Sequence, residues 1–454
     1  MMKLSGKKIL VVGLGESGAA AARWLAGQGS QVTVSEQQKE SGLDKDVIKD
    51  SLESGIKLEC GGHKIKTFLE SDLIVVSPGV PLDIKPLVEA RKKEVPIIGE
   101  IELASRYLET PAIAVTGTNG KSTVVELIGD MLLKGGNNVF VGGNIGRPLT
   151  RYLEGEQTAD YAVIELSSFQ LDTIETFSPL VALILNVSPD HLDRYEDYDS
   201  YARSKERIFS NQGPGKVLFL NDDDSWLRNL KLLNGPTVYR YGLERRSGLH
   251  AFLDNGEIVA NLPRSKRFRF TLDRFSLIGT HNQANLMASI LTALVLGVSV
   301  SAVQEAIDDF KGLPHRLEFV DEVRGVSFYN DSKATNIDAA IKSISSFARP
   351  VILIAGGRHK GSDYLPLFEA TPGRVKGAVF LGEAGGLLAE AAADRIPWKI
   401  STDMSDAVVL AYAQSRKGDV VLLAPACSSF DMFTNFQHRG VVFREVVRRL
   451  KNGA

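Results

Sequence analysis

The chain has 454 residues, roughly three times a typical domain, so we expect roughly two to four domains, each with its own buried core. The residues are 44% hydrophobic and 24% charged, as in globular proteins, and 53 basic against 55 acidic residues exclude a nucleic-acid backbone as the main partner. Two cysteines, Cys60 and Cys427, are too few for a disulfide framework and suit a reducing cytoplasm, and the N-terminal apolar run is too short for a signal peptide.

Strand-like runs alternate with helical patterns along the chain, which predicts an α/β fold with mainly parallel sheets. Three of these strands, at 9–12, 112–115 and 351–355, run directly into glycine-rich turns. Because a strand that leads into a helix N-terminus creates an anion site, each turn marks a possible nucleotide-binding unit. We therefore expect a Rossmann-like domain at 1–108, a P-loop ATPase-like parallel sheet at 109–312 and a Rossmann-like domain at 313–454.

The first glycine cluster is a complete G-x-G-x-x-G, with Gly13, Gly15 and Gly18 after a strand and Glu36 at the end of the next strand. This pattern is typical of dinucleotide binding, with the acid placed to bind a ribose hydroxyl. The same turn can hold other phosphate-bearing ligands. We favour a nucleotide other than NAD, while an NAD-type cofactor and a purely structural turn remain alternatives.

The second cluster, TGTNGKST at 116–123, lies between a buried strand and an apolar helix expected near Val124. Its backbone N–H groups can wrap phosphates, Lys121 can neutralise their charge, and the hydroxyl of Ser122 can bind Mg²⁺. The strict phosphate-loop pattern has glycine five positions before Gly120, where Val115 stands here. The sequence therefore predicts a shortened variant of the phosphate loop.

Candidate metal ligands follow the next two strands. Glu165 ends the strand at 161–164, and Asp190, His191 and Asp193 follow the strand at 180–185. Because parallel strand ends converge on one crevice, these side chains are expected near the phosphates held by Lys121. Mg²⁺ prefers oxygen ligands, which favours Glu165 over His191. A structural hydrogen bond is the alternative for each residue alone.

The segment 285–303 contains 19 residues without a charge, near the length that spans a bilayer. Ser289 and Thr292 interrupt it, Gly297 is typical of a helix end, and Ser301 is placed to open a second helix. We therefore predict two short buried helices and no membrane insertion.

Three further clusters are unusually polar. GTHNQAN places Asn282 and Asn285 at the start of an apolar helix, where the amides could contact a base or cap the helix. LPHRLE contains Arg316, and YNDSKATN at 329–336 gathers Asp331, Lys333 and further polar residues in one turn. A basic residue from a neighbouring domain can reach a terminal phosphate and complete a transfer site. Capping or a surface turn is the alternative for each cluster.

Taken together, TGTNGKST, IELSSFQL, NVSPDHLDRY, YARSKERI, GTHNQAN, LPHRLE and NDSKATN resemble the ATP-dependent Mur ligases, which build the peptide of the bacterial cell-wall precursor. The match runs in order over nearly the whole chain. GLGESG, SPGV at 77–80 and APACSSFDMFTNFQHRG look like the members that add D-glutamate to UDP-N-acetylmuramoyl-L-alanine. The DNPR-type signature of the members that add a diamino acid does not occur.

The resemblance implies a function for each motif. The ATP phosphates would be held by Gly117, Thr118, Asn119, Gly120, Lys121, Ser122 and Thr123, and the adenosine and γ-phosphate by Asn282, Asn285, Arg316 and Asp331. One Mg²⁺ would bind Ser122 and Glu165, and a second His191 and a carbamylated Lys205. The UDP substrate would lie along Gly15, Glu16, Ser17, Glu36, Gly79, Asn144 and His191. D-Glutamate would be received by Lys333, Thr335, Lys360, Ser429 and Phe436. The residues expected to act in the reaction itself are Lys121, Glu165, His191, Lys205 and Arg316, in a chain that works as a monomer.

Other functions remain to be distinguished. Another Mur-type amino-acid ligase would share the ATP residues but accept a different amino acid. An NAD-dependent oxidoreductase would explain only the first 36 residues. A nucleotide-regulated binding module would use the phosphate loop as a switch and ignore D-glutamate.

Overall fold

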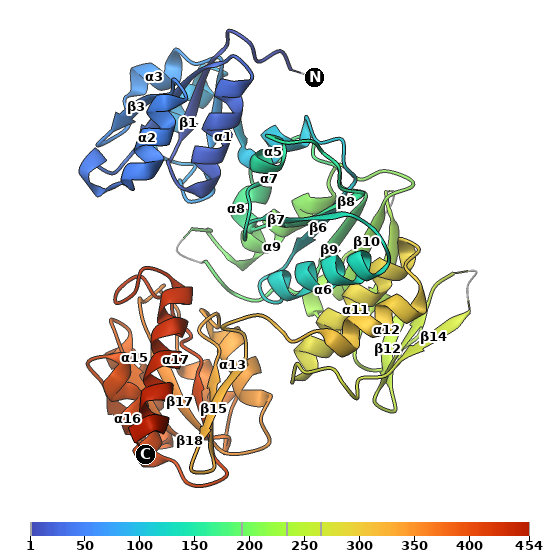
Figure 1. The fold of residues 1–454 in the computed structure, drawn as a ribbon, viewed down its shortest axis with the longest axis vertical. Coiled ribbons are helices and arrows are strands. Elements are labelled where there is room, and N and C mark those ends of the chain that lie inside the picture. Colours follow the sequence, from blue (N-terminus) through green and yellow to red (C-terminus); the bar gives the residue numbers. More distant parts are fainter. Residues whose placement is uncertain (1, 192–193, 233–234, 264–265, 454) are drawn as a thin grey trace.

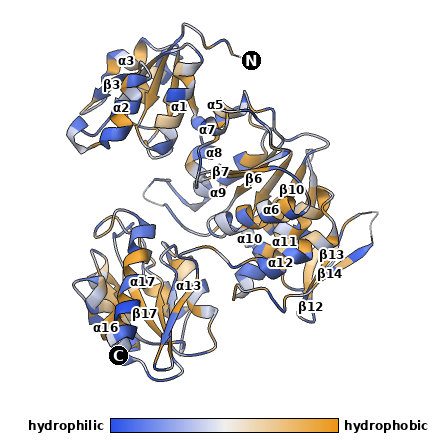
Figure 2. Ribbon diagram, in the orientation of Figure 1, coloured by the Kyte–Doolittle hydropathy of each residue, from blue (hydrophilic) through white to orange (hydrophobic). Residues whose placement is uncertain are grey.

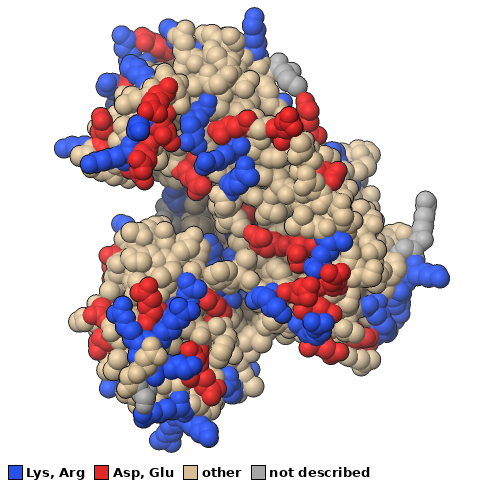
Figure 3. Space-filling model, in the orientation of Figure 1, with Lys and Arg blue, Asp and Glu red and all other residues tan. Residues whose placement is uncertain are grey.

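The computed structural model describes residues 2–191, 194–232, 235–263 and 266–453, and it contains three sheets of five, nine and six strands. The sheets belong to three α/β units that follow one another along the chain, which confirms the predicted fold class (Figure 1). The molecule is hollowed between the N-terminal and C-terminal units, and acidic and basic side chains are interspersed over the face shown in Figure 3.

The N-terminal sheet is parallel throughout. Its order is β3 (Lys57–Cys60), β2 (Gln31–Glu36), β1 (Lys8–Val12), β4 (Leu73–Val76) and β5 (Ile97–Gly99). The helical segments are α1 (Glu16–Gly27), η1 (Glu40–Gly42), α2 (Lys45–Glu53), α3 (Ile65–Leu69), α4 (Lys85–Lys92) and α5 (Glu100–Ser105). Leu103 of α5 packs in this core, whereas Ile101 and Ala104 pack in the core of the central unit. Helix α5 therefore joins the two units, and the boundary at residue 108 stays a prediction.

The central sheet has the order β14 (Arg267–Phe270), β13 (Glu257–Asn261), β12 (Ala251–Asp254), β11 (Thr237–Tyr241), β10 (Val217–Asn221), β9 (Val181–Ile184), β6 (Ala112–Thr116), β8 (Tyr161–Glu165) and β7 (Val139–Gly143). Its helical segments are α6 (Lys121–Lys134), α7 (Leu149–Tyr152), α8 (Ser168–Leu171), α9 (Tyr198–Glu206), η2 (Arg207–Phe209), α10 (Ser225–Arg228), α11 (Thr280–Val295) and α12 (Val300–Asp309). Strands β12 to β14 pair antiparallel and form one edge of the sheet.

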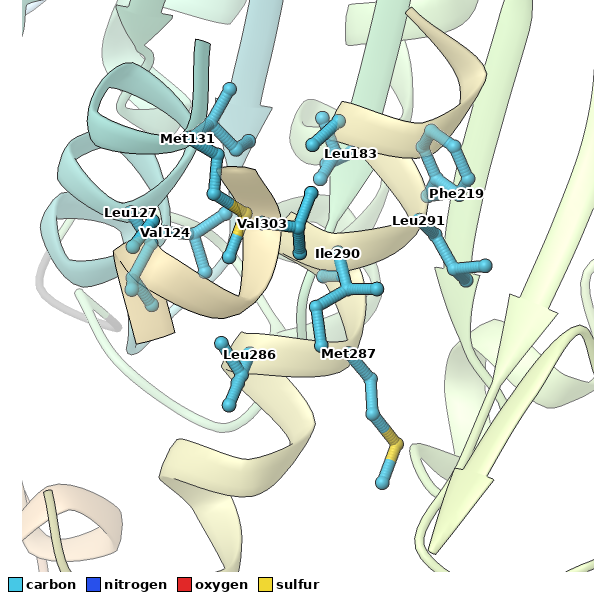
Figure 4. Packing of buried hydrophobic residues seen from close by; sticks show 14 of the residues in the cluster. Val124, Leu127, Met131, Leu183, Phe219, Leu286, Met287, Ile290, Leu291 and Val303 are labelled. Carbon is cyan, nitrogen blue, oxygen red and sulfur yellow. The ribbon is translucent and has the colours of Figure 1, made fainter. Parts of the chain in front are cut away.

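One face of the central sheet is covered by α6, α11 and α12. Figure 4 shows Leu127 of α6, Ile290 of α11 and Val303 of α12 packed toward Leu183 and Phe219 of the sheet, all of them buried. Strands buried on both faces are almost wholly apolar, and the strands of all three sheets are mostly hydrophobic in Figure 2. This packing holds the N-termini of α6 and α11 beside the ends of β6 and β9.

The uncharged segment 285–303 forms parts of α11 and α12, as predicted. The first helix ends at Val295, and Gly297 follows it with φ of 85°. The second helix begins at Val300 rather than at Ser301, because the Ser299 side chain accepts a hydrogen bond from the Ala302 N–H and caps it. Among the described residues, no helix has the length and apolar character needed to cross a membrane.

The C-terminal sheet has the order β15 (Glu318–Val323), β16 (Val326–Asn330), β20 (Val420–Leu423), β17 (Val351–Gly356), β18 (Val375–Leu381) and β19 (Trp398–Ile400), with only β15 antiparallel to its neighbour. Its helical segments are α13 (Ile337–Ser345), α14 (Leu365–Glu369), α15 (Gly385–Ala392), η3 (Ala393–Arg395), α16 (Met404–Gln414) and α17 (Phe436–Gly453). The loops after β16 and β17 contact the central unit through Asn336 and Lys360, which both lie beside Asp190.

Candidate active site

The loop at 117–120 connects β6 to the N-terminus of α6, as the sequence predicts. Gly117 and Gly120 have φ of 154° and 87°, which favour glycine. A side-chain carbon at Gly120 would also lie 2.5 Å from Oδ1 of Asn285. The glycines therefore allow both the turn and the close approach of α11, and the free N–H groups at the start of α6 form an anion site.

Asn186, directly after β9, holds this loop in place. Its carbonyl accepts from the Thr118 N–H at 2.9 Å, its Oδ1 accepts from the Asn119 N–H at 2.8 Å, and its Nδ2 donates to the Asn119 carbonyl at 2.9 Å. Sequence analysis did not single out Asn186, although it opens the NVSPDHLDRY motif. The loop is thus fixed by the neighbouring strand end before any ligand binds.

Lys121 folds back over its own loop. Its Nζ donates to the carbonyls of Gly117 at 2.8 Å and Thr118 at 3.0 Å. Burial lowers the pKa of Lys121, against the opposing effect of the Glu165 carboxylate. The ammonium group is therefore poorly solvated and held at the mouth of the loop, where an incoming phosphate would be its strongest partner.

Glu165, at the end of β8, belongs to a group of polar contacts that joins four separate segments. Its carboxylate accepts from Ser122 Oγ at 2.6 Å and from Asn144 Nδ2 at 2.8 Å, and Ser122 Oγ in turn accepts from Arg316 Nη2 at 2.7 Å. Burial alone would raise the pKa of Glu165, but the charge of Lys121 and the bond from Ser122 hold it below its ordinary value. An ionised carboxylate beside a hydroxyl is a donor set of the kind that Mg²⁺ prefers.

These donors fit an ion that also binds phosphate oxygens and water. Within the described residues, no group of three or more His, Cys, Asp or Glu side chains is placed to hold a metal by itself. Mg²⁺ commonly uses one or two carboxylates together with substrate phosphates, so Ser122 and Glu165 suffice beside the phosphate loop.

The predicted second pair, His191 and Lys205, lies close to Tyr201. The ring centroids of His191 and Tyr201 are 6.3 Å apart, and Lys205 Nζ lies 4.4 Å from the Tyr201 ring centroid. Lys205 is only 2% exposed, and burial, followed by the charge of Lys121, lowers its pKa well below the ordinary value. The structure therefore brings both residues toward the phosphate loop, while Asp193 lies outside the described residues.

Helix α9 begins at Tyr198, because the Asp197 side chain caps it by accepting from the Ser200 N–H. Tyr201 lies on this helix, four residues before Lys205. Its hydroxyl lies 3.0 Å from Thr118 Oγ1, so this helix also contacts the phosphate loop directly.

A cavity beside the phosphate loop contains the predicted nucleoside residues. It is lined by Gly120, Asn282, Asn285, Arg316 and Asp331, together with His281, Lys342 and Ser343. The last three were not predicted; His281 lies inside the GTHNQAN motif, whereas nothing in the local sequence marks Lys342 or Ser343. The capping alternative for the two asparagines is wrong, because no side chain caps α11 and Asn282 Nδ2 donates to the Ile278 carbonyl at 2.8 Å.

Asp331 is buried beside Ser343, whose hydroxyl donates to it, and burial raises the pKa of Asp331 from 3.8 to about 6. The folded state therefore binds more protons than the unfolded state between about pH 4 and 6, and this group makes the protein less stable as the pH rises through that range.

Asp331→Asn should stabilise the ligand-free protein at pH 8 by about 1–3 kcal/mol, since it removes a buried charge, and the gain should shrink at pH 5, where the wild-type carboxyl is protonated. Thermal denaturation at both pH values checks this, with Asp394→Asn, at an exposed position of the same unit, as the control. An equal gain at pH 5 and pH 8 would contradict it.

Three loops of the C-terminal unit and the start of α17 carry the remaining predicted residues. Lys333 Nζ lies 4.0 Å from the Phe436 ring centroid, and the Phe436 carbonyl accepts from Ser332 Oγ at 2.8 Å. The turn that carries Lys360 is joined to the Ser429 loop through the Arg358 N–H and the Ser428 carbonyl at 2.9 Å. Thr335 lies in the same turn as Lys333. Burial and the charge of Arg316 lower the pKa of Lys333 to about 7.

The buried side chain of Arg439 joins these loops through hydrogen bonds to their carbonyl groups. It is 1% exposed and donates to the carbonyls of Ser332, Cys427 and Ser428 at 2.8 to 3.3 Å. Sequence analysis did not predict this role, because an arginine in an amphipathic helix is usually solvated.

The N-terminal residues lie on their own glycine loop. Gly15 and Glu16 are exposed and Ser17 is half-buried, while Glu36 accepts from the N–H groups of Leu14 at 2.7 Å and Gln38 at 2.9 Å. Glu36 therefore already supports the turn. Gly79 faces the central unit, where its carbonyl accepts from Arg194 Nη1 at 3.3 Å.

These three units and their loops define an ATP-dependent ligase of the three-domain type, and comparisons with known proteins agree. Residues 7–99 match the model of the Mur ligase MurD-like N-terminal domain, 115–293 that of the Mur ligase middle domain, and 315–427 that of the Mur ligase glutamate ligase domain. The chain belongs to the Mur ligase family.

The similarity to individual relatives extends over the full length of the chain. A UDP-N-acetylmuramoylalanine–D-glutamate ligase of Acidobacterium capsulatum is 44% identical, covering 98% of this chain and 97% of the relative, and one of Geotalea uraniireducens is 43% identical, covering 100% of both. Two solved structures share the fold, each with a TM-score of 0.61. One is a pseudomurein peptide ligase type C from Methanothermus fervidus, which is 20% identical and matches 98% of this chain and 100% of its own. The other is the MurF ligase of Thermotoga maritima in complex with ADP, which is 16% identical and matches 99% of this chain and 100% of its own.

Proposed function

We propose that this chain adds D-glutamate to UDP-N-acetylmuramoyl-L-alanine at the expense of ATP, in the synthesis of the peptidoglycan precursor. The observation that carries the proposal is the position of Ser122, which donates to Glu165 and accepts from Arg316 of the C-terminal unit, beside the charge of Lys121; this arrangement supports a phosphate-transfer site between two units. The full-length relatives carry the name of the same reaction.

The chemistry explains why such a site is needed. A carboxylate resists attack by an amine because it is negatively charged and has no good leaving group. Transfer of the γ-phosphoryl group to a carboxylate oxygen gives an acyl phosphate and ADP. The amine of D-glutamate then attacks the acyl carbon, an amide C–N bond forms, inorganic phosphate leaves, and the amine loses a proton. Each step needs cations around the phosphates and a site closed to water.

We assign the residues accordingly. Gly117 to Thr123 hold the phosphates, with Lys121 as the main positive charge, while Asn282, Asn285, Asp331 and Arg316 contact the nucleoside and the γ-phosphate. Ser122 and Glu165 would hold one Mg²⁺, and His191 with a carbamylated Lys205 a second. Bound Mg²⁺ would neutralise charge on the triphosphate.

The residues proposed for the two remaining substrates come from the two outer units and from Asn144 and His191 of the central unit. Lys333, Thr335, Lys360, Ser429 and Phe436 would receive D-glutamate. Gly15, Glu16, Ser17, Glu36, Gly79, Asn144 and His191 would line the UDP substrate. All of these residues come from one chain, so we propose that the monomer is active. Both cysteines are free thiols, which supports our proposal that the protein acts in the reducing cytoplasm. The domain boundaries at 108 and 312 are part of the same proposal.

Phosphate release from ATP tests the function. The protein is incubated with UDP-N-acetylmuramoyl-L-alanine and a panel of D- and L-amino acids, and release should require both this substrate and D-glutamate. Preference for another amino acid would assign a different Mur-type ligase. Release that needs a protein partner would favour a nucleotide-regulated module, and absorbance change at 340 nm with NAD would favour an oxidoreductase.

Lys360→Ala should raise the KM for D-glutamate at least about tenfold, because a charge-assisted hydrogen bond to a carboxylate contributes about 1.5–3 kcal/mol. Lys360 is 20% exposed and its Nζ lies 3.7 Å from Asp190 Oδ1, at the edge of the central unit. Steady-state kinetics over D-glutamate concentration measure the effect, and Lys399→Ala, at an exposed strand residue of the same unit, is the control. An unchanged KM for D-glutamate in Lys360→Ala would show that Lys360 does not bind this substrate.

A further inference from the structure

Helix α13 of the C-terminal unit touches the phosphate loop of the central unit through one carboxylate. Oδ2 of Asp338, in the first turn of α13, accepts from Asn119 Nδ2 at 2.7 Å, from Ser188 Oγ at 2.9 Å and from Lys342 Nζ at 2.7 Å. Asn119 and Ser188 belong to the central unit, whereas Lys342 lies one turn further along α13. A single oxygen therefore joins two segments of one unit to a helix of another.

Asn336, the capping residue of α13, adds two contacts of the same kind. Its side chain accepts from the Ala339 N–H and so begins the helix, while its Nδ2 donates to Asp190 Oδ2 at 2.9 Å and to Asn119 Oδ1 at 3.4 Å. The start of α13 is thus fixed both to its own helix and to the central unit.

Asn119 is consequently held from two sides. Its backbone N–H and carbonyl are both bound by Asn186 of the central unit, and its side-chain amide is bound by Asp338 and Asn336 of the C-terminal unit. When the C-terminal unit moves away, the backbone bonds can persist, but the side-chain bonds cannot. The backbone of the phosphate loop at Asn119 is therefore held within the central unit, whereas the orientation of the Asn119 side chain depends on contact between the units.

We infer that Asp338 is a positioning residue that couples docking of the amino-acid-binding unit to the phosphate loop. This role rests on the proposed function, in which the C-terminal unit carries D-glutamate. Asp338 touches none of the reacting atoms assigned above. It acts through Asn119 and Ser188, so that these two side chains beside the phosphates are held in place only when the C-terminal unit is docked.

The charge of Asp338 suits this role. Hydrogen bonds to a carboxylate are roughly twice as strong as bonds between neutral groups, so two neutral donors of the central unit gain a strong partner. In the undocked state Asp338 would keep Lys342 and the helix N-terminus as favourable neighbours. Its removal should therefore weaken docking more than it weakens the fold.

The experiment compares Asp338→Ala with the wild type and with Ser345→Ala, which changes an exposed residue of the same helix. Asp338→Ala should raise the KM for ATP about tenfold or lower kcat by a similar factor, with the KM for UDP-N-acetylmuramoyl-L-alanine unchanged. Ser345→Ala should match the wild type. Equal increases in the KM values of all three substrates would indicate general loss of structure and would overturn the inference.

Small-angle X-ray scattering provides a readout that needs no ligase activity. With ADP bound, Asp338→Ala should have a larger radius of gyration than the wild type, because its C-terminal unit docks less often. Identical scattering together with unchanged kinetics overturns the inference. If instead no amino acid supports phosphate release in the wild type, but the scattering difference persists, the proposed function fails and the coupling role stands.

A double-mutant cycle that combines Asp338→Ala with Ser188→Ala tests whether the hydrogen bond between these two residues carries the effect. If Ser188 acts through Asp338, the double variant should be little worse than Asp338→Ala alone, whereas fully additive effects would mean that the two residues act independently and would overturn the contact. Should Asp338→Ala fail to fold, scattering of Ser188→Ala decides the question, since it removes one of the same bonds from the central side.

Discussion

Lys121→Ala should reduce turnover by at least about 10²-fold while leaving the fold intact. Loss of a preorganised group that stabilises charge in the transition state costs about 3 kcal/mol or more. Among the described residues, Lys121 Nζ donates its hydrogen bonds to carbonyls of its own loop, so its removal leaves Glu165 with its bonds from Ser122 and Asn144.

The measurement is kcat for ATP-dependent phosphate release, with circular dichroism and thermal denaturation to confirm folding. Lys134→Ala is the matched control, because Lys134 lies at the other end of α6 and pairs with Glu305 and Asp309 at the surface. Near-wild-type turnover in a folded Lys121→Ala protein would remove Lys121 from the phosphate site.

Lys205→Ala should lose most of its activity and regain part of it with added formate or acetate. An ammonium group has three donors and no acceptor, so it cannot bind Mg²⁺. The neutral amine can attack CO₂: a N–C bond forms, one proton leaves the nitrogen, and the resulting carbamate supplies two oxygens. Burial of Lys205 and the nearby charge of Lys121 favour the neutral amine that this reaction requires.

A second readout of this prediction does not depend on activity. In ¹³C-bicarbonate buffer the wild type should show a carbamate carbon resonance that Lys205→Ala lacks. Arg203→Ala, an exposed change on the same helix, should retain both the resonance and the activity. Full activity of Lys205→Ala without added carboxylate would show that no ligand is needed from this position.

Much of the local structure could be predicted because it depends on neighbours in the chain. The glycines of the phosphate loop, the buried β6 and the apolar face of α6 lie within about 20 residues, and steric and hydrophobic preferences over that distance specify a strand, a turn and a helix. The error at Val300 is an error of capping, since Ser299 begins α12 one residue earlier than the sequence pattern suggests.

The assembly of the site was decided by tertiary structure. Arg316 reaches Ser122 across 194 residues and Asp338 reaches Asn119 across 219 residues, and no periodic pattern encodes either pairing. The sequence by itself determined which residue types were available at each strand end: a lysine and a serine at the loop, a glutamate after β8, an arginine and an aspartate beyond the central unit. Which of these side chains meet depends on strand order and on the contact between units, because both bring distant segments of the chain together. Only side chains within hydrogen-bond distance gain from this, since the energy of a contact falls steeply with separation.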